Sequence, residues 1–154
     1  MKITICGSIG FYPKMEEIRN ELVAHGHKVE MPELALEIPK HLTGGKKVFF
    51  KRYIEDNGGI KAFPPGHGIW DVKEDAMRNH FKKIDGAEAI LVVNEDKNGI
   101  QGYVGGNGLI EIGVAFYTKK KIYILNHVSN ELSYKQEILS MKPTTIDGDL
   151  SRIK

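Results

Sequence analysis

The feature that most restricts the fold of this chain is an apolar run, a glycine-rich turn, a helical run and a second apolar run in succession. Residues 89–93 have the length and composition of a buried strand, and residues 122–125 form another. Between them, the Gly-Gly-Asn-Gly turn at 105–108 opens a helix-like run that ends near 119–121. Strand, helix and strand in this order are typical of a parallel sheet with right-handed crossovers.

The N-terminal region repeats this pattern. Residues 2–6 predict a short strand, and the Gly-Ser-Ile-Gly sequence at 7–10 predicts a tight turn after it. Residues 13–25 keep helical spacing, and Gly26 predicts the end of that helix. Residues 28–31 predict a second strand, which completes a β-α-β unit.

The remaining segments complete the expected architecture. They are a helix at 70–84, a short helix at 132–139 and an edge strand at 144–146. We therefore expect a single α/β domain over residues 1–154. Its sheet should be parallel and doubly wound, in flavodoxin-like (Rossmann-like) order, with about five strands and helices on both faces.

An irregular excursion rich in proline and glycine occupies residues 32–69. Long connections between the layers of an α/β domain are usually lids or rims. Residues 46–57 predict one helix inside it, and a basic cluster on that helix is either a solvated face or a phosphate-facing lid. The cluster is Lys46, Lys47, Lys51 and Arg52.

Composition and charge exclude several classes of protein. The net charge of +2 is too small to indicate a nucleic-acid polymer as partner. The lone Cys6 excludes a disulfide framework and fits a reducing compartment. No signal peptide is visible, and no apolar run approaches the roughly 20 residues of a membrane span. We expect a cytoplasmic protein that does not enter a membrane.

Both glycine-containing turns should lie at the same edge of the sheet, because the carboxyl ends of parallel strands meet there. Each turn offers backbone N–H groups at a helix start, which suits an anion. Glu111 lies one turn inside the second helix between apolar neighbours, and a buried carboxylate is unusual. Together these features indicate a nucleotide-like ligand, with a phosphate at one turn and a sugar or second anion at the other. A carboxylate near a helix N-terminus can also be purely stabilising, by up to about 1 kcal/mol.

No cofactor is predicted. A dinucleotide fingerprint G-x-G-x-x-G would need a third glycine where Glu111 stands, and that carboxylate would repel a pyrophosphate. The first turn also has the wrong spacing for this fingerprint. His25 and His27 have no cysteine or carboxylate pattern around them, so we predict no metal site.

Two segments of the chain resemble the nucleoside 2-deoxyribosyltransferase family and its relatives, the 2′-deoxynucleoside 5′-monophosphate N-glycosidases. The resemblance spans residues 2–31 and about 76–125. It implies that Glu111 is a catalytic nucleophile and that the first loop binds the 5′ end of a nucleotide. It further implies a homodimer or higher homo-oligomer, because family members complete their sites across a dimer interface. The matching motifs are Cys6-Gly7-Ser8-Ile9, Ile110-Glu111-Ile112-Gly113-Val114-Ala115 and Lys121-Ile122-Tyr123-Ile124-Leu125.

The family has an aspartate that helps to handle the leaving base, and His80 occupies the corresponding position. A histidine can donate a proton near neutral pH, but His80 also lies on the apolar side of its helix, where a core role is equally open. Tyr12 could touch a sugar or cover a helix start, and Asn107 could bind a ligand or cap its helix. With the catalytic candidates Glu111 and His80, the predicted substrate-binding residues are Gly7, Ser8, Ile9, Gly10, Tyr12, Gly105, Gly106, Asn107 and Gly108.

The expected activity is cleavage or exchange of the N-glycosidic bond of a 2′-deoxynucleoside or its 5′-monophosphate. Hydrolase or transferase, purine or pyrimidine, and nucleoside or monophosphate stay open. One alternative is a phosphoribohydrolase of the cytokinin-activating type, with the motif P-G-G-x-G-T-x-x-E. Val104 and Leu109 replace its proline and threonine, and Glu111 falls one position early. A nucleotide-binding sensor without turnover is the other alternative.

Overall fold

The computed structural model describes residues 1–154 and divides them into two compact units. One, here called the sheet unit, comprises Met1–Pro32 and Phe81–Lys154. The other, the helical unit, is Glu33–His80. The division falls inside one continuous helix, α3 (Ile69–Asp85). The expectation of a single domain is not tested by this division and stays a prediction.

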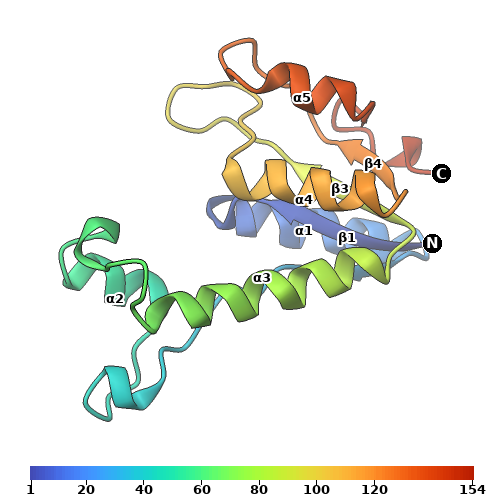
Figure 1. The fold of residues 1–154 in the computed structure, drawn as a ribbon. Coiled ribbons are helices and arrows are strands. Elements are labelled where there is room, and N and C mark those ends of the chain that lie inside the picture. Colours follow the sequence, from blue (N-terminus) through green and yellow to red (C-terminus); the bar gives the residue numbers. More distant parts are fainter. The chain divides into compact units, whose positions relative to one another are not determined.

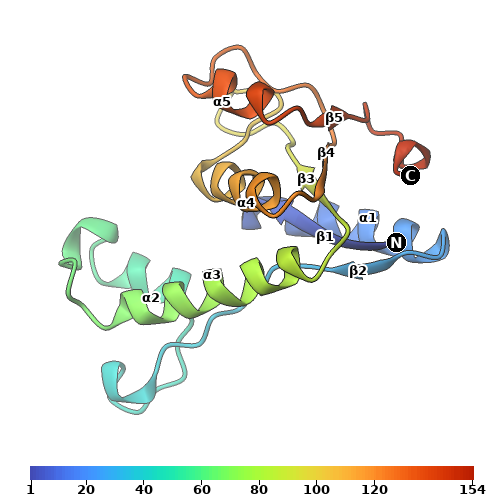
Figure 2. The same ribbon diagram turned by 45° about the vertical axis from the view of Figure 1, so that its right-hand side comes forward.

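The sheet unit contains five parallel strands in the order β2-β1-β3-β4-β5. Figure 1 labels β1, β3 and β4, and Figure 2 labels all the strands. This is the predicted flavodoxin-like order, in which a ligand binds at the carboxyl ends of the strands. The shortest strand, β5, lies where the sequence predicts an edge strand. The strands are β1 (Lys2–Gly7), β2 (Lys28–Glu30), β3 (Ala89–Val93), β4 (Lys121–Ile124) and β5 (Thr144–Thr145).

Helices cover both faces of this sheet, as predicted (Figure 2). Side chains alternate between faces along a strand, so Ile5 of β1 packs with α1 (Tyr12–Ala24) while Cys6 faces the other side. On that second side lie α4 (Gly106–Tyr117) and α5 (Lys135–Ser140). None of the helices combines the length and hydropathy that a membrane crossing requires.

Two predicted helices are shorter than expected. The run 46–57 forms only α2 (Phe50–Asp56), because Phe49 is extended and bridges Glu37 in an antiparallel pair. In the run 132–139, α5 begins only at Lys135.

The helical unit has an apolar cluster of its own, so residues 33–69 are more ordered than the predicted excursion. Trp70 packs edge-on against Phe63 and donates its indole N–H to the carbonyl of Pro64 at 2.9 Å. The cluster is Ile38, Ile54, Phe63 and Ile69.

The basic cluster of the helical unit behaves as a solvated face. Arg52 pairs with Asp56 at 2.8 Å, and two of the lysines lie 4.0 Å from glutamates. These pairs are exposed and contribute little to stability.

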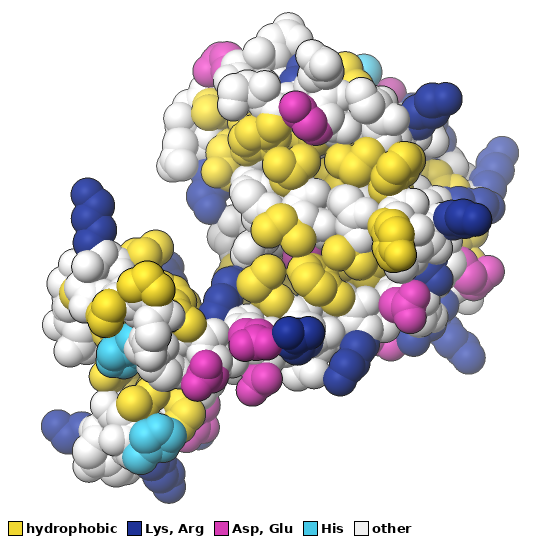
Figure 3. Space-filling view, viewed as in Figure 1, with side chains coloured by type: hydrophobic (Ala, Val, Ile, Leu, Met, Phe, Trp, Pro, Cys, Tyr) yellow, Lys and Arg dark blue, Asp and Glu magenta, His cyan; other side chains and the backbone are white.

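Helix α4 presents an apolar face to solvent. Phe116 is 55% exposed and Tyr117 is 86% exposed, and Ile110 is also exposed. Figure 3 shows apolar side chains gathered over the face along which α4 runs. Contiguous apolar surface of this kind usually marks a binding or association surface.

Candidate functional site

Glu111 is buried in the middle of α4, with only 7% of its surface exposed. The backbone N–H of Gly7, at the end of β1, donates to its Oε2 at 2.9 Å. This donor belongs to the first loop and not to the glycine-rich turn at 105–108 that opens α4. Side chains on a helix point back toward its N-terminus, and here that direction meets the end of β1. A hydrogen bond from a buried donor stabilises the ionised carboxylate.

Residue 7 must be glycine, because its backbone has a positive φ and because the end of β3 lies too close for a Cβ. Its φ is +129°, and a Cβ there would lie 2.6 Å from the carbonyl oxygen of Val93. Gly108 approaches the same point from α4, since a Cβ on it would lie 3.9 Å from the Gly7 Cα and 3.2 Å from a methyl of Val104. The two predicted turns therefore do meet at one edge of the sheet.

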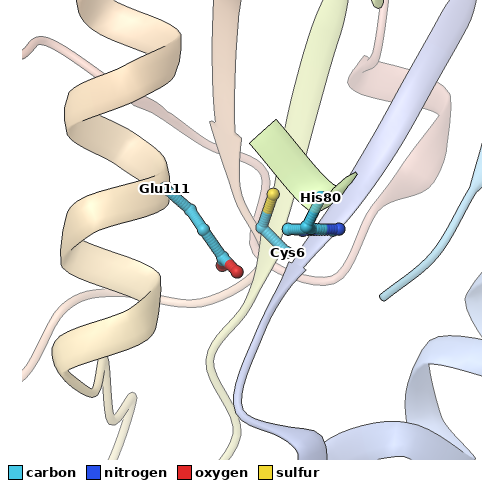
Figure 4. A group of neighbouring side chains, drawn as sticks. All are labelled: Cys6, His80 and Glu111. Atoms are coloured by element: carbon cyan, nitrogen blue, oxygen red, sulfur yellow. The ribbon is translucent and has the colours of Figure 1, made fainter. Parts of the chain in front are cut away.

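Glu111 is one of three neighbouring titratable side chains (Figure 4). The others are Cys6 of β1 and His80 of α3, and all three are buried. One potential ligand atom from each lies within 4.8 Å of the other two. The two catalytic candidates of the sequence are thus neighbours, although they are 31 positions apart in the chain (111 − 80).

Cys6 is a neighbour that the sequence analysis did not connect with the site. Burial raises the pKa of its thiol well above the ordinary value, and the negative charge of Glu111 and a thiol–carboxylate hydrogen bond raise it further. The thiol therefore stays protonated at neutral pH and can donate to Glu111. Strand alternation from the buried Ile5 could have placed Cys6 on the face of α4.

The same three side chains offer sulfur, nitrogen and oxygen atoms of the kind that zinc accepts. The sequence had predicted no metal site, and the spacing of 6, 80 and 111 matches no metal motif. A metal would have to displace the proton from Cys6, because thiolate is the ligand form. In the metal-free arrangement the raised thiol pKa favours the protonated, hydrogen-bonding form.

Lys97 is a further residue that the sequence analysis missed. It lies after β3, and its Nζ donates to the Ser8 hydroxyl at 2.8 Å. Lys97 opens a two-residue hairpin, in which it exchanges backbone hydrogen bonds with Ile100. Asn98 and Gly99 form the turn with φ of 55° and 76°. Asn-Gly is the strongest short hairpin signal, and it could have been found from the sequence.

The other predicted substrate-binding residues divide by location. Ser8 caps the short helix at 9–11 and accepts from the Gly10 N–H, while Ile9 and Gly10 are exposed beside it. Tyr12 is half-buried and packs against the core on the α1 side. Gly105 is the N-cap of α4, and Gly106 and Asn107 are exposed in its first turn. Asn107 is therefore not the helix cap that the sequence had left open.

A pair of asparagines ties the loops after β3 and β4 together. The buried Asn94 side chain donates to the Asn126 carbonyl at 2.9 Å and accepts from the Asn126 N–H at 2.8 Å. Asn126 in turn donates to the Asn94 carbonyl at 3.3 Å. These bonds order the carboxyl edge of the sheet next to the hairpin of Lys97.

No protein-family model and no curated protein sequence matches this chain. Among solved structures, it is similar to a 2-deoxyribosyltransferase from the psychrotolerant bacterium Bacillus psychrosaccharolyticus, with a TM-score of 0.52 and 14% identity. That alignment covers 92% of this chain and 82% of the other. A CMP N-glycosidase from Clostridium botulinum gives a TM-score of 0.48 and 13% identity, over 94% and 84% of the two chains.

The likeness to the 2-deoxyribosyltransferase shows that this chain has the same fold. It supports, at the level of fold, the resemblance found from the sequence motifs. The roles of individual residues rest on the geometry of the site.

Proposed function

We propose that this protein is an enzyme that cleaves or exchanges the N-glycosidic bond of a 2′-deoxynucleoside or its 5′-monophosphate. The observation that carries the proposal is the buried Glu111 carboxylate, held by the Gly7 N–H at the carboxyl edge of the sheet. In a doubly wound fold that edge is where ligands bind. The fold of a 2-deoxyribosyltransferase adds support.

Glu111 acts as the nucleophile in this proposal. Its carboxylate attacks the anomeric carbon of the deoxyribose on the face opposite the base, and a glycosyl ester forms as the bond from carbon to the base nitrogen breaks. Water then hydrolyses this ester and releases the sugar, or a second base attacks the sugar carbon and displaces the Glu111 carboxylate. The Gly7 hydrogen bond and the protonated Cys6 help to hold Glu111 in one orientation.

His80 supplies the proton that the departing base needs. An imidazole can donate near neutral pH, which makes it suitable as a general acid. His80 is a neighbour of Glu111 in the buried cluster. The histidine thereby takes the place of the aspartate that the resemblance implies.

The test is base release from a panel of 2′-deoxynucleosides and their 5′-monophosphates, followed by chromatography. Glu111→Gln should lose on the order of 10⁴-fold or more in kcat, because it keeps the shape and removes the nucleophile. Glu16→Gln, which changes an exposed residue of α1, is the matched control. His80→Asp should retain more activity than His80→Ala. Tight nucleotide binding without any base release in the wild-type protein would favour the sensor alternative instead.

We also propose that the chain forms a homodimer in the cytoplasm through the apolar face of α4. Exposed aromatic side chains on that helix support this surface as the contact. A second copy would remove Phe116 and Tyr117 from water, which is favourable by roughly 25 cal/mol per Å² of apolar area.

A further inference from the structure

A second hollow lies at the amino edge of the sheet, where the parallel strands begin. It is bordered by the end of α4 and the start of β4, and by the end of α5 and the start of β5. Its volume of about 550 Å³ falls within the range of small-molecule sites. Gly7, which binds the Glu111 carboxylate, ends β1 at the carboxyl edge. This groove is therefore distinct from the candidate catalytic site.

Lysines from both helix ends line this groove, and no acidic residue does. The lysines, which define what is here called the lysine groove, are Lys119, Lys120, Lys121 and Lys142. Lys120 donates its Nζ to the Asp85 carbonyl, and Lys121 donates its Nζ to the Lys154 carbonyl at 2.7 Å. The exposed ammonium groups of Lys119 and Lys142 have no hydrogen-bond or ion-pair partner within the chain. Like charges around one hollow repel one another, and a bound anion would relieve that repulsion.

The two lysines without partners occupy equivalent positions on two helices. Lys119 directly follows the C-cap of α4, and Lys142 directly follows the C-cap of α5. Their φ values are 58° and 51°, in the left-handed region. Glycine is the usual residue at this position, because a residue with a Cβ is less stable there by about 1–2 kcal/mol. Both helices that border the groove therefore carry a charged side chain where glycine would fit the backbone better.

A lysine at a helix C-terminus can also stabilise the helix itself, because that end has a partial negative charge. At an exposed position this interaction contributes about 0.3–1 kcal/mol. That gain does not exceed the conformational cost of the positive φ, and α5 is only 6 residues long. Stabilisation of the helix ends therefore does not account for a lysine at both positions, whereas a ligand between them does.

The lysine groove also has an apolar part. Ile122 and Tyr123 of β4 are buried in it, and the half-buried Met141 and the exposed Phe116 border it. Aromatic rings and the methionine sulfur make favourable contacts with a flat ring. Phe116 also belongs to the apolar face of α4, whereas the lysines at 119–121 follow that helix. An anion with an apolar body fits these surroundings better than a hydrated inorganic ion.

We infer that the lysine groove binds an organic polyanion with a flat apolar ring, a chemistry that a nucleoside triphosphate combines in one molecule. The negative groups of the ligand pair with Lys119 and Lys142, and its ring lies against Met141 and Phe116. Charge-assisted hydrogen bonds from lysine are among the stronger polar contacts with such groups. The groove lies at the opposite edge of the sheet from Gly7, so a ligand can occupy it while a substrate is bound at Glu111.

The experiment is a calorimetric titration with adenosine triphosphate, tripolyphosphate and adenosine. Adenosine triphosphate should bind most tightly, because only it offers both the charges and the ring. The double variant Lys119→Gly, Lys142→Gly should weaken that binding about 10- to 100-fold. Its Tm should be no lower than that of the wild type, because glycine relieves the positive φ at both positions. The double variant Lys28→Met, Lys61→Met removes the same charge from exposed residues outside the groove and should bind as the wild type does.

A further variant separates the lysine groove from the candidate catalytic site. Glu111→Gln should bind adenosine triphosphate in the groove as tightly as the wild type does. Equal binding by the wild type and the double glycine variant, or loss of binding in Glu111→Gln, would place the ligand elsewhere and overturn the inference. Tripolyphosphate that binds as tightly as adenosine triphosphate would overturn the role given to the ring. A lower Tm with unchanged binding in the double glycine variant would assign the two lysines to the stability of the helix ends.

Discussion

Replacement of Gly7 by alanine should disturb both the stability of the protein and its candidate nucleophile. At a φ of +129°, a residue with a Cβ is strained by about 1–3 kcal/mol. The new methyl would also lie 2.6 Å from the Val93 carbonyl oxygen, and overpacking of this kind adds about 1–3 kcal/mol. The sum is about 2–6 kcal/mol of lost unfolding free energy. For a chain of this length, the lower figure alone corresponds to a fall in Tm of about 4–8 °C.

The same substitution should displace the N–H that binds Glu111. Relief of the contact with Val93 requires β1 to shift at its end, and misplacement of a reacting group by about 1 Å can lower the rate about 100-fold. We therefore expect base release to fall by that order even where the variant is folded. Calorimetric melting and the deoxynucleotide assay measure the two effects separately.

Gly26→Ala provides a matched control. Gly26 also has a positive φ, of +86°, but a Cβ there would meet no atom within 4 Å. The loss of unfolding free energy in Gly26→Ala should come only from the positive φ, about 1–2 kcal/mol, and turnover should not change. If Gly7→Ala melts no lower than Gly26→Ala and keeps full activity, the close approach of β1, β3 and Glu111 is refuted.

Three further predictions concern Cys6, the asparagine pair and the α4 face. The pKa of the Cys6 thiol is raised in the folded state, so the thiol keeps its proton there at pH values where it loses it in the unfolded chain. Its contribution to the free energy of unfolding is therefore complete below the unfolded pKa of about 8.5. Above that pH the contribution declines, by at most about 1.4 kcal/mol per pH unit. Urea unfolding of Cys6→Ala at increasing pH should show a correspondingly smaller decline than the wild type, and identical slopes would contradict this. Asn94→Ala should cost about 3 kcal/mol and Asn126→Ala about 1 kcal/mol in urea unfolding, because the Asn94 side chain makes two bonds with the Asn126 backbone, at 2.9 and 2.8 Å, whereas the Asn126 side chain makes one longer bond to the Asn94 carbonyl, at 3.3 Å; equal losses would argue against it. Phe116→Glu should halve the particle mass measured by light scattering, whereas Val23→Glu on α1 should not; an unchanged mass would exclude the α4 face as the contact.

Much of the sheet unit could be predicted from local patterns. The predicted strand at 89–93 agrees with β3, since a short apolar run between turn signals has few alternatives. The order of the strands followed from the alternation of strands and helices and from the right-handed crossover rule. The helix predicted at 46–57 was too long at its start. Phe49 is extended there and pairs with Glu37, and a contact between two separate segments leaves no local pattern in the sequence.

Only part of the candidate site could be predicted from the sequence. Glu111 stood out because a carboxylate in an apolar helix is rare. The hydrogen bond from Gly7 joins positions 104 residues apart, so no local pattern reports it. Lys97 is one of many lysines in the chain, and only its position over the first loop distinguishes it. The Asn98-Gly99 hairpin was the one overlooked signal that would have drawn attention to this loop.

That hairpin has a consequence for how firmly Lys97 is held. Ordering a flexible loop on binding costs roughly 1–2 kcal/mol per residue in backbone entropy. Here Asn98 and Gly99 already adopt the left-handed conformations that the turn needs, and Lys97 and Ile100 are already bonded to each other. The backbone that carries Lys97 is therefore preorganised, and little entropy would be lost in fixing it against a binding partner. Exchange of Asn98 and Gly99 for residues that avoid positive φ would loosen the turn while leaving the Lys97 side chain itself unchanged.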